Sequence, residues 1–403
     1  MGTGDIYVAR PELEHGKIKR NDKMDFALTE EQGFIRDTIK KFVAKECERE
    51  AVKVMDEEGT FPADLFGKLS GIGLCALTVP EADGGGGPNA LGAVIVTAEL
   101  AAIYPALAGL FATQSLCAGQ LIADLGTPEQ KKKYIPGIMD GSLLMTLALM
   151  EPGQGYTEAD HKTTAAPDGD RLILNGTKAF VRLADHAGFM IAYVGTGSDG
   201  GAGDFVVVDL RSPGVVVRLL PSVGFSGMNL CEVSLESAAV GASERLGGSA
   251  GAVTDRKKWE KVMSAEHLAV AACGIGLARG AYDYALNYAR ERVQFGQPII
   301  KFGAVTEMLV DMVQQTRAAT LLTYQAASGV DRGRDCLEET IQARIAATEA
   351  ARSAALYGVQ IFGGYGYAME YDAQRYLRDS MVLLSGGGTK QVLSNTLAGL
   401  WGY

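Results

Sequence analysis

The sequence of 403 residues predicts an α+β protein in which a β domain lies between two helical domains. Apolar residues recur at helical spacing over residues 24–142 and again over residues 256–403. Between these two regions, residues 143–255 hold short runs of β-branched residues bounded by glycine, aspartate and serine. Because a chain of 403 residues ordinarily forms two or three domains, we expect three, preceded by an N-terminal extension over residues 1–23.

Capping residues and helix-breaking residues predict the helices of the first domain. Thr29 precedes an amphipathic run and predicts a capped helix, and a second helix is expected over residues 62–72. Residues 90–125 are apolar on nearly every side, which predicts buried helices interrupted at Pro105. Thr127, followed by proline and glutamate, predicts the start of a further helix.

A change of period separates the other two domains. The segments RLILNG, FMIAYV, DFVVVDL and GVVVRLL read as short strands separated by turn residues. From Arg256 the helical period returns, and it predicts long helices through Arg290, over residues 302–329 and over residues 337–362. The order helix, sheet, helix therefore describes the whole chain.

Composition excludes several classes of function. The net charge of −10 and the scattered basic residues argue against a nucleic-acid partner. The six cysteines are far apart, with no C-x-x-C pair and no histidine at metal-ligand spacing, which favours buried thiols in a reducing compartment. The first 23 residues contain no apolar core, and apolar runs elsewhere are interrupted by glycine, proline or charge. We therefore expect a cytoplasmic protein that does not span a membrane and holds no metal.

A stretch near the C-terminus, residues 355–392, combines two glycine clusters with two arginines. The first cluster, residues 363–366 (GGYG), ends an apolar helical run, and glycine there lets a flat or anionic ligand approach backbone N–H groups. Arg375 and Arg378 share one face of a short helix, which the second cluster, residues 385–389, ends. Taken alone, both clusters are better explained as ordinary helix C-caps. A dinucleotide fingerprint is excluded because a helix, not a strand, precedes the glycines.

Three motifs in this stretch, GVQIFGGYGYAMEY, RYLRD and GGGTKQV, together resemble the C-terminal signature of the acyl-CoA dehydrogenase flavoprotein family. The resemblance implies an acyl-CoA dehydrogenase-like fold with an N-terminal helical domain, a middle β-barrel or sheet domain and a C-terminal four-helix bundle. It also implies FAD as cofactor, an acyl-CoA thioester as substrate and electron-transfer flavoprotein as partner. Family members complete the flavin site across subunits, so a homotetramer is expected.

The same resemblance assigns residues to the cofactor. Arg292 and Phe295 match the family's R-x-x-F-G motif, in which the arginine meets the pyrophosphate and the phenylalanine packs near the adenine. A guanidinium suits this task because its planar fork donates two parallel hydrogen bonds to a phosphate. Positions that match the family's remaining contacts to the ribityl, pyrophosphate and adenine portions are Gln360, Gly363, Gly364, Gly388, Thr389 and Gln391.

The resemblance also indicates where a catalytic base is expected. A thioester α-proton is weakly acidic, so its removal needs a carboxylate, which most family members place directly before Gly-Thr in the last motif. This chain has Gly387 there. Glu266 matches the alternative position of isovaleryl-CoA dehydrogenase and crotonobetainyl-CoA reductase, at the start of an apolar run where an unpaired charge is costly. A helix-start glutamate is the competing interpretation, and His267 is expected to be structural.

Four flavin-contacting positions depart from the family pattern. Met150 and Tyr156 replace a threonine and a serine in the family's T-E-P-x-A-G-S-D segment. Phe180 and Arg182 replace the tryptophan and the second threonine of the K-x-W-I-T segment, and that threonine lies near flavin N5. A cation at this position favours the anionic reduced flavin.

These observations lead to one principal hypothesis and two alternatives. The principal hypothesis is an FAD-dependent acyl-CoA dehydrogenase that acts on a branched, cyclic or otherwise substituted acyl-CoA and passes electrons to electron-transfer flavoprotein. An enoyl-CoA reductase would run the same chemistry in the opposite direction. A non-redox acyl-CoA lyase or binding scaffold would keep the fold after losing the polar flavin contacts.

Overall fold

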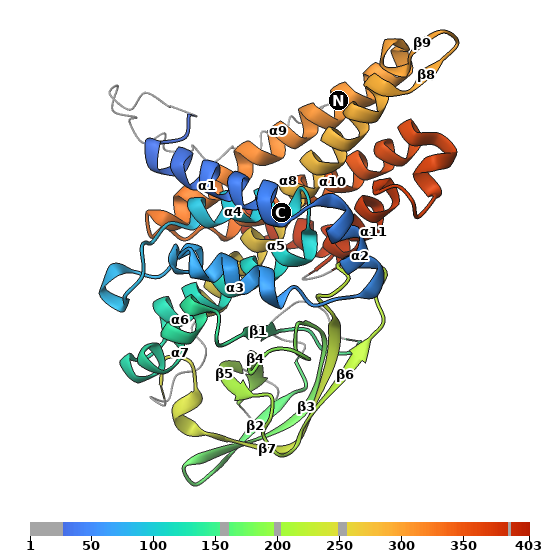
Figure 1. The fold of residues 1–403 in the computed structure, drawn as a ribbon. Helices are drawn as coiled ribbons and strands as arrows, with labels where there is room; N and C mark the ends of the chain where they lie inside the picture. Colours follow the sequence, from blue (N-terminus) through green and yellow to red (C-terminus); the bar gives the residue numbers. More distant parts are fainter. Residues whose placement is uncertain (1–26, 154–160, 197–202, 249–255, 386–387) are drawn as a thin grey trace, which may run out of the picture.

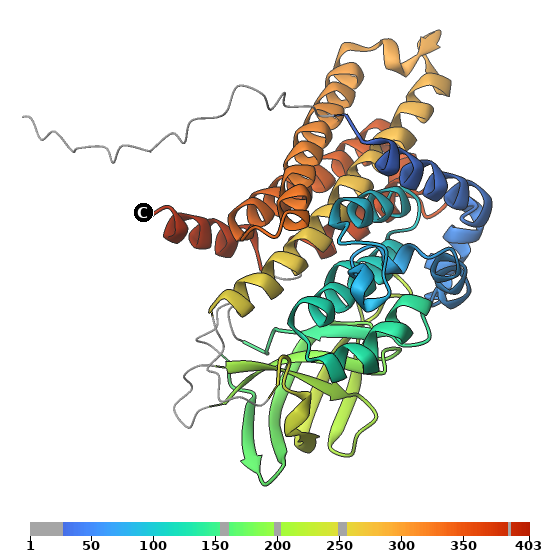
Figure 2. The same ribbon diagram turned by 90° about the vertical axis from the view of Figure 1, so that its left-hand side faces the viewer.

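The computed structural model describes residues 27–153, 161–196, 203–248, 256–385 and 388–403. In Figure 1 the helices form the upper part of the molecule and the sheet forms the lower part, and Figure 2 shows the same two layers from the side. The predicted fold class is confirmed, because helices precede and follow the strands in the chain. The expected extension over residues 1–23 lies outside the described residues.

The N-terminal helices start where their caps predict. In α1 the Gln32 backbone N–H donates to Thr29 Oγ1 at 3.2 Å, and the Thr29 N–H donates to Gln32 Oε1 at 3.0 Å. The same reciprocal cap begins α7 at Thr127. The elements of this part are α1 (Glu30–Glu46), α2 (Arg49–Glu58), α3 (Ala63–Gly71), α4 (Ala90–Ala101), α5 (Pro105–Ala112), a π-helical segment (Thr113–Gly119), α6 (Gln120–Leu125) and α7 (Pro128–Asp140).

A mixed sheet forms the middle of the chain. Its strands are β1 (Met145–Ala148), β2 (Thr164–Asp168), β3 (Arg171–Arg182), β4 (Phe189–Gly195), β5 (Gly203–Asp209), β6 (Val215–Leu220) and β7 (Leu230–Gly241). They follow the order β1-β4-β2-β3-β7-β6, and β5 pairs with β4. β1 runs parallel to β4, whereas β3 is antiparallel to β7. The β3–β7 register shifts between Lys178 and Val181, and this irregularity lies beside the candidate site.

Long helices dominate the C-terminal part. They are α8 (Arg256–Glu291), α9 (Gly303–Asp331), α10 (Leu337–Phe362), α11 (Ala373–Ser385) and α12 (Lys390–Leu400), with a hairpin of β8 (Val293–Gln294) and β9 (Gln297–Pro298) after α8. α8 packs against α4, α9, α10 and α11. Gly276 and Gly280 permit the approach to α4, since a Cβ on them would lie 2.3 Å from Ala98 O and 2.2 Å from Ala102 O.

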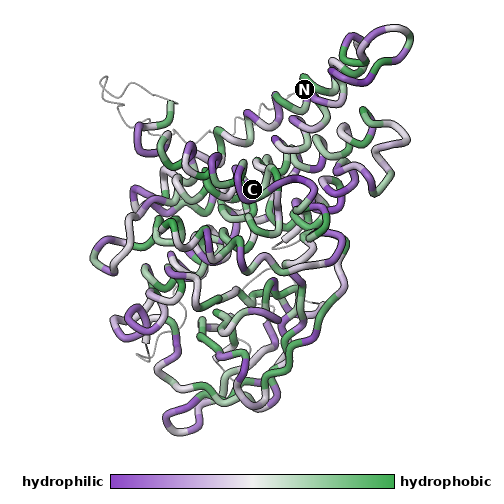
Figure 3. Tube along the Cα trace, in the orientation of Figure 1, coloured by the Kyte–Doolittle hydropathy of each residue, from purple (hydrophilic) through white to green (hydrophobic). Residues whose placement is uncertain are grey.

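Two helical segments are long and apolar enough by composition to cross a membrane, Pro105–Leu125 and Arg256–Glu291. In each, 94% of the apolar window is buried inside the fold, which is typical of core helices. The hydropathy trace in Figure 3 agrees, because hydrophobic segments concentrate where the helices pack on one another.

Candidate active site

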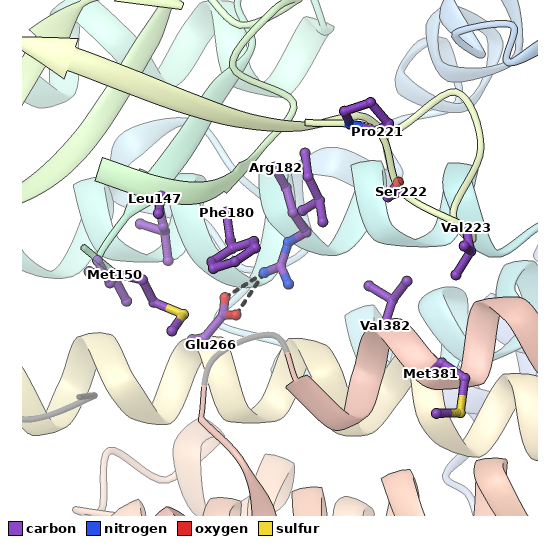
Figure 4. A pocket seen from close by; sticks show the side chains of 13 residues that line it. Leu147, Met150, Phe180, Arg182, Pro221, Ser222, Val223, Glu266, Met381 and Val382 are labelled. Carbon is purple, nitrogen blue, oxygen red and sulfur yellow. Dashed lines mark hydrogen bonds and ion pairs between the residues drawn. The ribbon is translucent and has the colours of Figure 1, made fainter. Parts of the chain in front are cut away.

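A cavity of about 400 Å³ lies between the sheet and the helices α8 and α11. Figure 4 shows β3 and the segment after β6 above it and α8 below it. Most of its wall is apolar, and among the described residues that line it Arg182 is the one cation and Glu266 the one anion. The lining residues are Leu147, Leu149, Met150, Ala179, Phe180, Arg182, Pro221, Ser222, Val223, Leu230, Glu266, Met381 and Val382.

The irregular end of β3 carries two of the predicted site residues into this cavity. Phe180 lies in the interval where the pairing with β7 is interrupted, and its backbone has a φ of 54°. A left-handed conformation is costly for a bulky side chain, and such strain is concentrated at functional sites. The Phe180 ring is 53% exposed, and Figure 4 shows it beside Arg182 and Glu266.

Arg182 and Glu266 form a direct ion pair across the cavity. Arg182 Nη2 donates to Glu266 Oε1 at 2.7 Å and to Oε2 at 2.8 Å. The side chain of Glu266 is 4% exposed and that of Arg182 is 20% exposed. The sequence led us to consider an unpaired carboxylate on an apolar helix, and that interpretation is wrong. The partner comes from β3, 84 residues earlier in the chain, which helical periodicity does not show.

Other ionisable groups near this pair are held neutral. Burial lowers the pKa of His267 well below its usual value, and the neighbouring Arg344 charge adds to this effect. Arg344 Nη1 lies 2.9 Å from His267 Nδ1, so Nδ1 accepts the hydrogen bond. Burial also raises the pKa of Cys117 well above its usual value and that of Cys273 to about 12. Glu266 is therefore the candidate base among these neighbours.

The RYLRD motif holds one wall of the cavity in place. Arg378 Nη1 donates to Val223 O at 2.8 Å, and the Phe225 N–H donates to Asp379 Oδ1 at 2.6 Å. Gly224 lies so close to α11 that a Cβ on it would stand 2.5 Å from Arg378 O. Arg375 is buried and pairs with Asp372 at 3.0 Å. These motif residues hold the segment after β6 in position. The charges of Arg375 and Arg378 are paired with aspartates of the protein itself.

A buried ion pair fixes the opposite wall near Met150. Lys178 Nζ donates to Glu151 Oε1 at 2.7 Å, and the Thr163 N–H donates to the same carboxylate. Burial lowers the pKa of Lys178 to about 8. Burial alone raises the pKa of Glu151, but the contacts of His161 and Lys178 overcome it and hold that pKa well below the usual range. The Ala179 N–H donates to Met150 O at 2.9 Å, which ties this segment to β3.

A second cavity, of about 360 Å³, brings together Arg292, Gly363 and Gly364 at the far end of α8. A Cβ on either glycine would meet no atom within 4 Å, so the backbone there faces open space. The Arg292 guanidinium lies 5.6 Å from the centre of the Tyr365 ring. Phe295, on the hairpin, has a φ of 50° and is 93% exposed.

The two cavities share no lining residue. Glu266 and Arg292 are separated by 26 positions along the α8 region, which corresponds to about 39 Å at the helical rise. Figures 1 and 2 show the β8–β9 hairpin at the end of the molecule opposite the sheet. One dinucleotide cannot reach both cavities of the same chain.

The remaining predicted cofactor residues are not brought to either cavity. Gln360, Thr389 and Gln391 are exposed, and Thr389 caps α12 by accepting from the Val392 N–H at 3.4 Å. Gly388 is buried with a φ of 102°, and its carbonyl accepts from Arg344 Nη2 at 3.2 Å. Tyr156 and Gly387 lie outside the described residues, so their predicted places are not seen.

Sequence reasoning missed the wall formed by residues 221–223 together with Met381 and Val382. The only signal was indirect, because RYLRD is a charged motif whose partners come from elsewhere in the chain. Sequence reasoning also placed Arg182 and Glu266 in the site separately, without predicting the ion pair between them. The opposite charges of these two predicted site residues were the available clue.

Comparison with known proteins identifies the family. The chain matches the acyl-CoA dehydrogenase N-terminal domain over residues 29–142, the middle domain over 146–238 and the C-terminal domain over 259–399. It is 33% identical to the caffeyl-CoA reductase-Etf complex subunit CarC of Acetobacterium woodii, over 93% of this chain and 98% of the relative. It is also 33% identical to the acryloyl-CoA reductase (NADH) of Anaerotignum propionicum, over 93% and 95% of the two chains.

Among solved structures, the butyryl-CoA dehydrogenase of Megasphaera elsdenii matches with a TM-score of 0.89 and 27% identity, covering 94% of this chain and all of the other. The chain belongs to the acyl-CoA dehydrogenase family. It is thus a flavoprotein oxidoreductase acting on CH–CH bonds, with FAD as cofactor.

The described residues fit FAD. Arg292 offers a guanidinium for a pyrophosphate, and the open backbone at Gly363 and Gly364 lets phosphate oxygens approach N–H groups. The apolar cavity beside Phe180 suits a flat ring system. Met150 supplies apolar surface at a position where the family resemblance implies a hydroxyl contact.

Proposed function

We propose that the protein is an FAD-dependent acyl-CoA dehydrogenase that oxidises the α,β-bond of a branched, cyclic or otherwise substituted acyl-CoA. The observation that carries this proposal is the placement of the Glu266 carboxylate in the wall of the cavity between sheet and helices. A general base must lie within hydrogen-bond reach of the proton it removes, and Glu266 is the carboxylate in this wall.

In this mechanism Glu266 removes the α-proton of the thioester. FAD, when bound, accepts the β-hydrogen as hydride. Arg182 presently donates two hydrogen bonds to Glu266, so both carboxylate oxygens are occupied by the guanidinium. Substrate must therefore displace at least one of these hydrogen bonds before a Glu266 oxygen can reach the α-proton. The apolar wall around the pair limits the access of water to the reacting carbon.

The proposal includes assembly of the flavin site from two copies of the chain. Arg292 and Glu266 lie too far apart for one FAD to contact both in a single chain. The exposed Phe295 and Tyr367, 93% and 89% accessible, lie at the same end as Arg292 and offer apolar surface for a second subunit. We therefore expect a dimer at least, and a homotetramer by analogy with the family.

Electron-transfer flavoprotein is the proposed electron partner. The A. woodii relative is named as a subunit of a caffeyl-CoA reductase-Etf complex, which supports the assignment. A cytoplasmic location is also proposed, and it is supported by the six cysteines, all of which are free and buried.

The second candidate function is reduction of an enoyl-CoA at the same site. It is favoured by the names of two similar proteins, which are reductases of caffeyl-CoA and acryloyl-CoA. Glu266 would then deliver a proton to the α-carbon instead of removing one. The direction depends on the flavin potential and on which electron partner is supplied.

An anaerobic titration tests the function. Purified protein should be yellow with bound FAD, and an acyl-CoA substrate should bleach the flavin before any acceptor is added. Electron-transfer flavoprotein or a dye should then restore the colour. A protein that binds FAD but is bleached by no saturated acyl-CoA, and whose reduced flavin is reoxidised by an enoyl-CoA, would establish the reductase instead. Failure of both reactions with protein that carries FAD would overturn the redox proposal.

A further inference from the structure

The end of β3 holds two unfavourable backbone conformations, one on each side of Arg182. Phe180 has a φ of 54° and Leu183 has a φ of 66°. Both are bulky residues, for which a left-handed conformation is costly and persists only where neighbouring groups hold it. The direction in which Arg182 leaves the strand therefore depends on the contacts that hold this short segment.

Hydrogen bonds from two neighbouring segments hold it. The Leu183 backbone N–H donates to Asn229 O at 2.9 Å, which is a bond between main-chain groups. From β1, Thr146 Oγ1 donates to the Arg182 carbonyl oxygen at 2.6 Å. The first bond does not depend on side-chain identity, whereas the second depends on one hydroxyl. A substitution at Thr146 therefore removes a support of the segment while the Arg182 side chain stays intact.

Thr146 lies behind the cavity wall. It is 1% exposed and is not among the described residues that line the cavity, whereas the next residue, Leu147, is. Neighbouring side chains of a strand point to opposite faces, which accounts for the difference. Thr146 thus reaches the cavity through Arg182, because it binds the carbonyl of the residue whose guanidinium lines the wall.

We propose that Thr146 is a positioning residue for the flavin reaction, because its hydrogen bond to the Arg182 carbonyl fixes the segment that directs the guanidinium to Glu266. The inference rests on the proposed function only in placing the flavin ring in this cavity. A cation near the ring favours the anionic reduced flavin, so the position of Arg182 contributes to the flavin potential. Without the Thr146 hydroxyl the strained segment relaxes, and the guanidinium is held less closely.

The test compares the flavin potentials of FAD-loaded variants by spectroelectrochemistry, with no thioester present. Thr146→Val keeps the branched shape and removes the hydroxyl, whereas Thr146→Ser keeps the hydroxyl. Loss of one neutral hydrogen bond changes an equilibrium by about two- to tenfold. Tenfold corresponds to about 30 mV for a two-electron couple, so Thr146→Val should lower the potential by up to about 30 mV. Thr146→Ser should leave it nearly unchanged.

Thr164→Val is the matched control. Thr164 Oγ1 donates to another carbonyl of β3, that of Asn175, at 3.4 Å, and neither residue lines the cavity. This variant should retain the unaltered potential. Thr146→Cys, which is similar in size and a much weaker donor, takes the place of Thr146→Val if the latter does not retain FAD, and the same downward shift is expected.

Arg182→Met separates positioning from a general contribution to the fold. In the Arg182→Met protein, Thr146→Val should still lower the melting temperature but should shift the potential no further, because the two residues act through one contact. A shift of equal size with and without Arg182, or no shift in either Thr146→Val or Thr146→Cys, would overturn the proposal. Because no thioester is present, failure of every acyl-CoA to bleach the flavin would count against the dehydrogenase function alone.

Discussion

Replacing Glu266 with glutamine is the most direct test of the proposed chemistry. Glutamine has nearly the same shape, and its amide oxygen can still accept from Arg182 Nη2, which now lies 2.7 Å from the carboxylate. The side chain is 4% exposed, so the replacement creates neither a cavity nor a clash. We therefore expect Glu266→Gln to fold, to retain FAD and to bind the thioester.

The chemical step should nevertheless slow sharply. Loss of a general base typically reduces a rate by ~10²–10⁴, equivalent to about 3–5 kcal/mol in the barrier. Anaerobic rapid mixing with a bleaching substrate measures this rate directly, separately from the dissociation constant. Glu260→Gln is the matched control, since Glu260 lies on the same helix and pairs with Arg256 at the surface. Its flavin should be reduced at the unaltered rate.

An unchanged reduction rate in Glu266→Gln would refute the reasoning and leave Glu266 as a residue that pairs with Arg182 for stability. A carboxylate restored by Gly387→Glu in the Glu266→Gln protein offers a complementary experiment. The family resemblance places a base at position 387, so partial recovery of the rate would show that the two positions approach the same carbon.

Three further predictions concern charged residues that line the two cavities or support the wall of the first. Arg182→Thr should lower the flavin potential and Glu266→Gln should raise it, by about 30 mV per 1.4 kcal/mol, because the two charges oppose each other; shifts of the same sign in spectroelectrochemistry would contradict this. Arg292→Ala should weaken FAD binding by about tenfold to a hundredfold without unfolding the chain, and flavin retention on ultrafiltration measures it. Burial raises the pKa of Asp379 to about 6, so the stability from this group is present below about pH 4 and is lost as pH rises through 6. Asp379→Asn should remove this pH dependence, at most about 3 kcal/mol, and a melting temperature that changes between pH 4.5 and 7.5 as in the unaltered protein would count against it.

Local signals explain which parts of the fold could be predicted. Thr29 and Thr127 cap helices through residues three positions away, so the sequence window contains the whole interaction. Pro105 begins α5 at its first position, as its fixed backbone angle and missing N–H require. By contrast, the break between α1 and α2 at Cys47 and Glu48 has no proline or glycine to mark it, and we expected a single helix there.

The RYLRD motif shows where sequence reasoning ends. Its spacing correctly predicts a short helix, but it does not indicate which groups the charged side chains contact. Their partners are distant in sequence: Arg378 pairs with Asp56 at 2.6 Å, and Asp379 accepts from the backbone of Phe225. No periodicity connects residues separated by more than 150 positions, so a charged motif can predict that partners exist without indicating which they are.

The helix α8 connects the two cavities on which the proposed function depends. Glu266, near one end, faces the cavity where the thioester reacts, and Arg292, just past the other end, faces the cavity suited to a pyrophosphate. If both belong to flavin sites, each copy of the chain contributes its base to one site and its arginine to another. The rigid length of about 39 Å between them then fixes the spacing of neighbouring sites, because a 36-residue helix packed on four others cannot shorten. Dissociation of the subunits would therefore remove Arg292, which binds the pyrophosphate, from a site whose Glu266 remains in place. Protein diluted until its subunits dissociate should accordingly lose FAD.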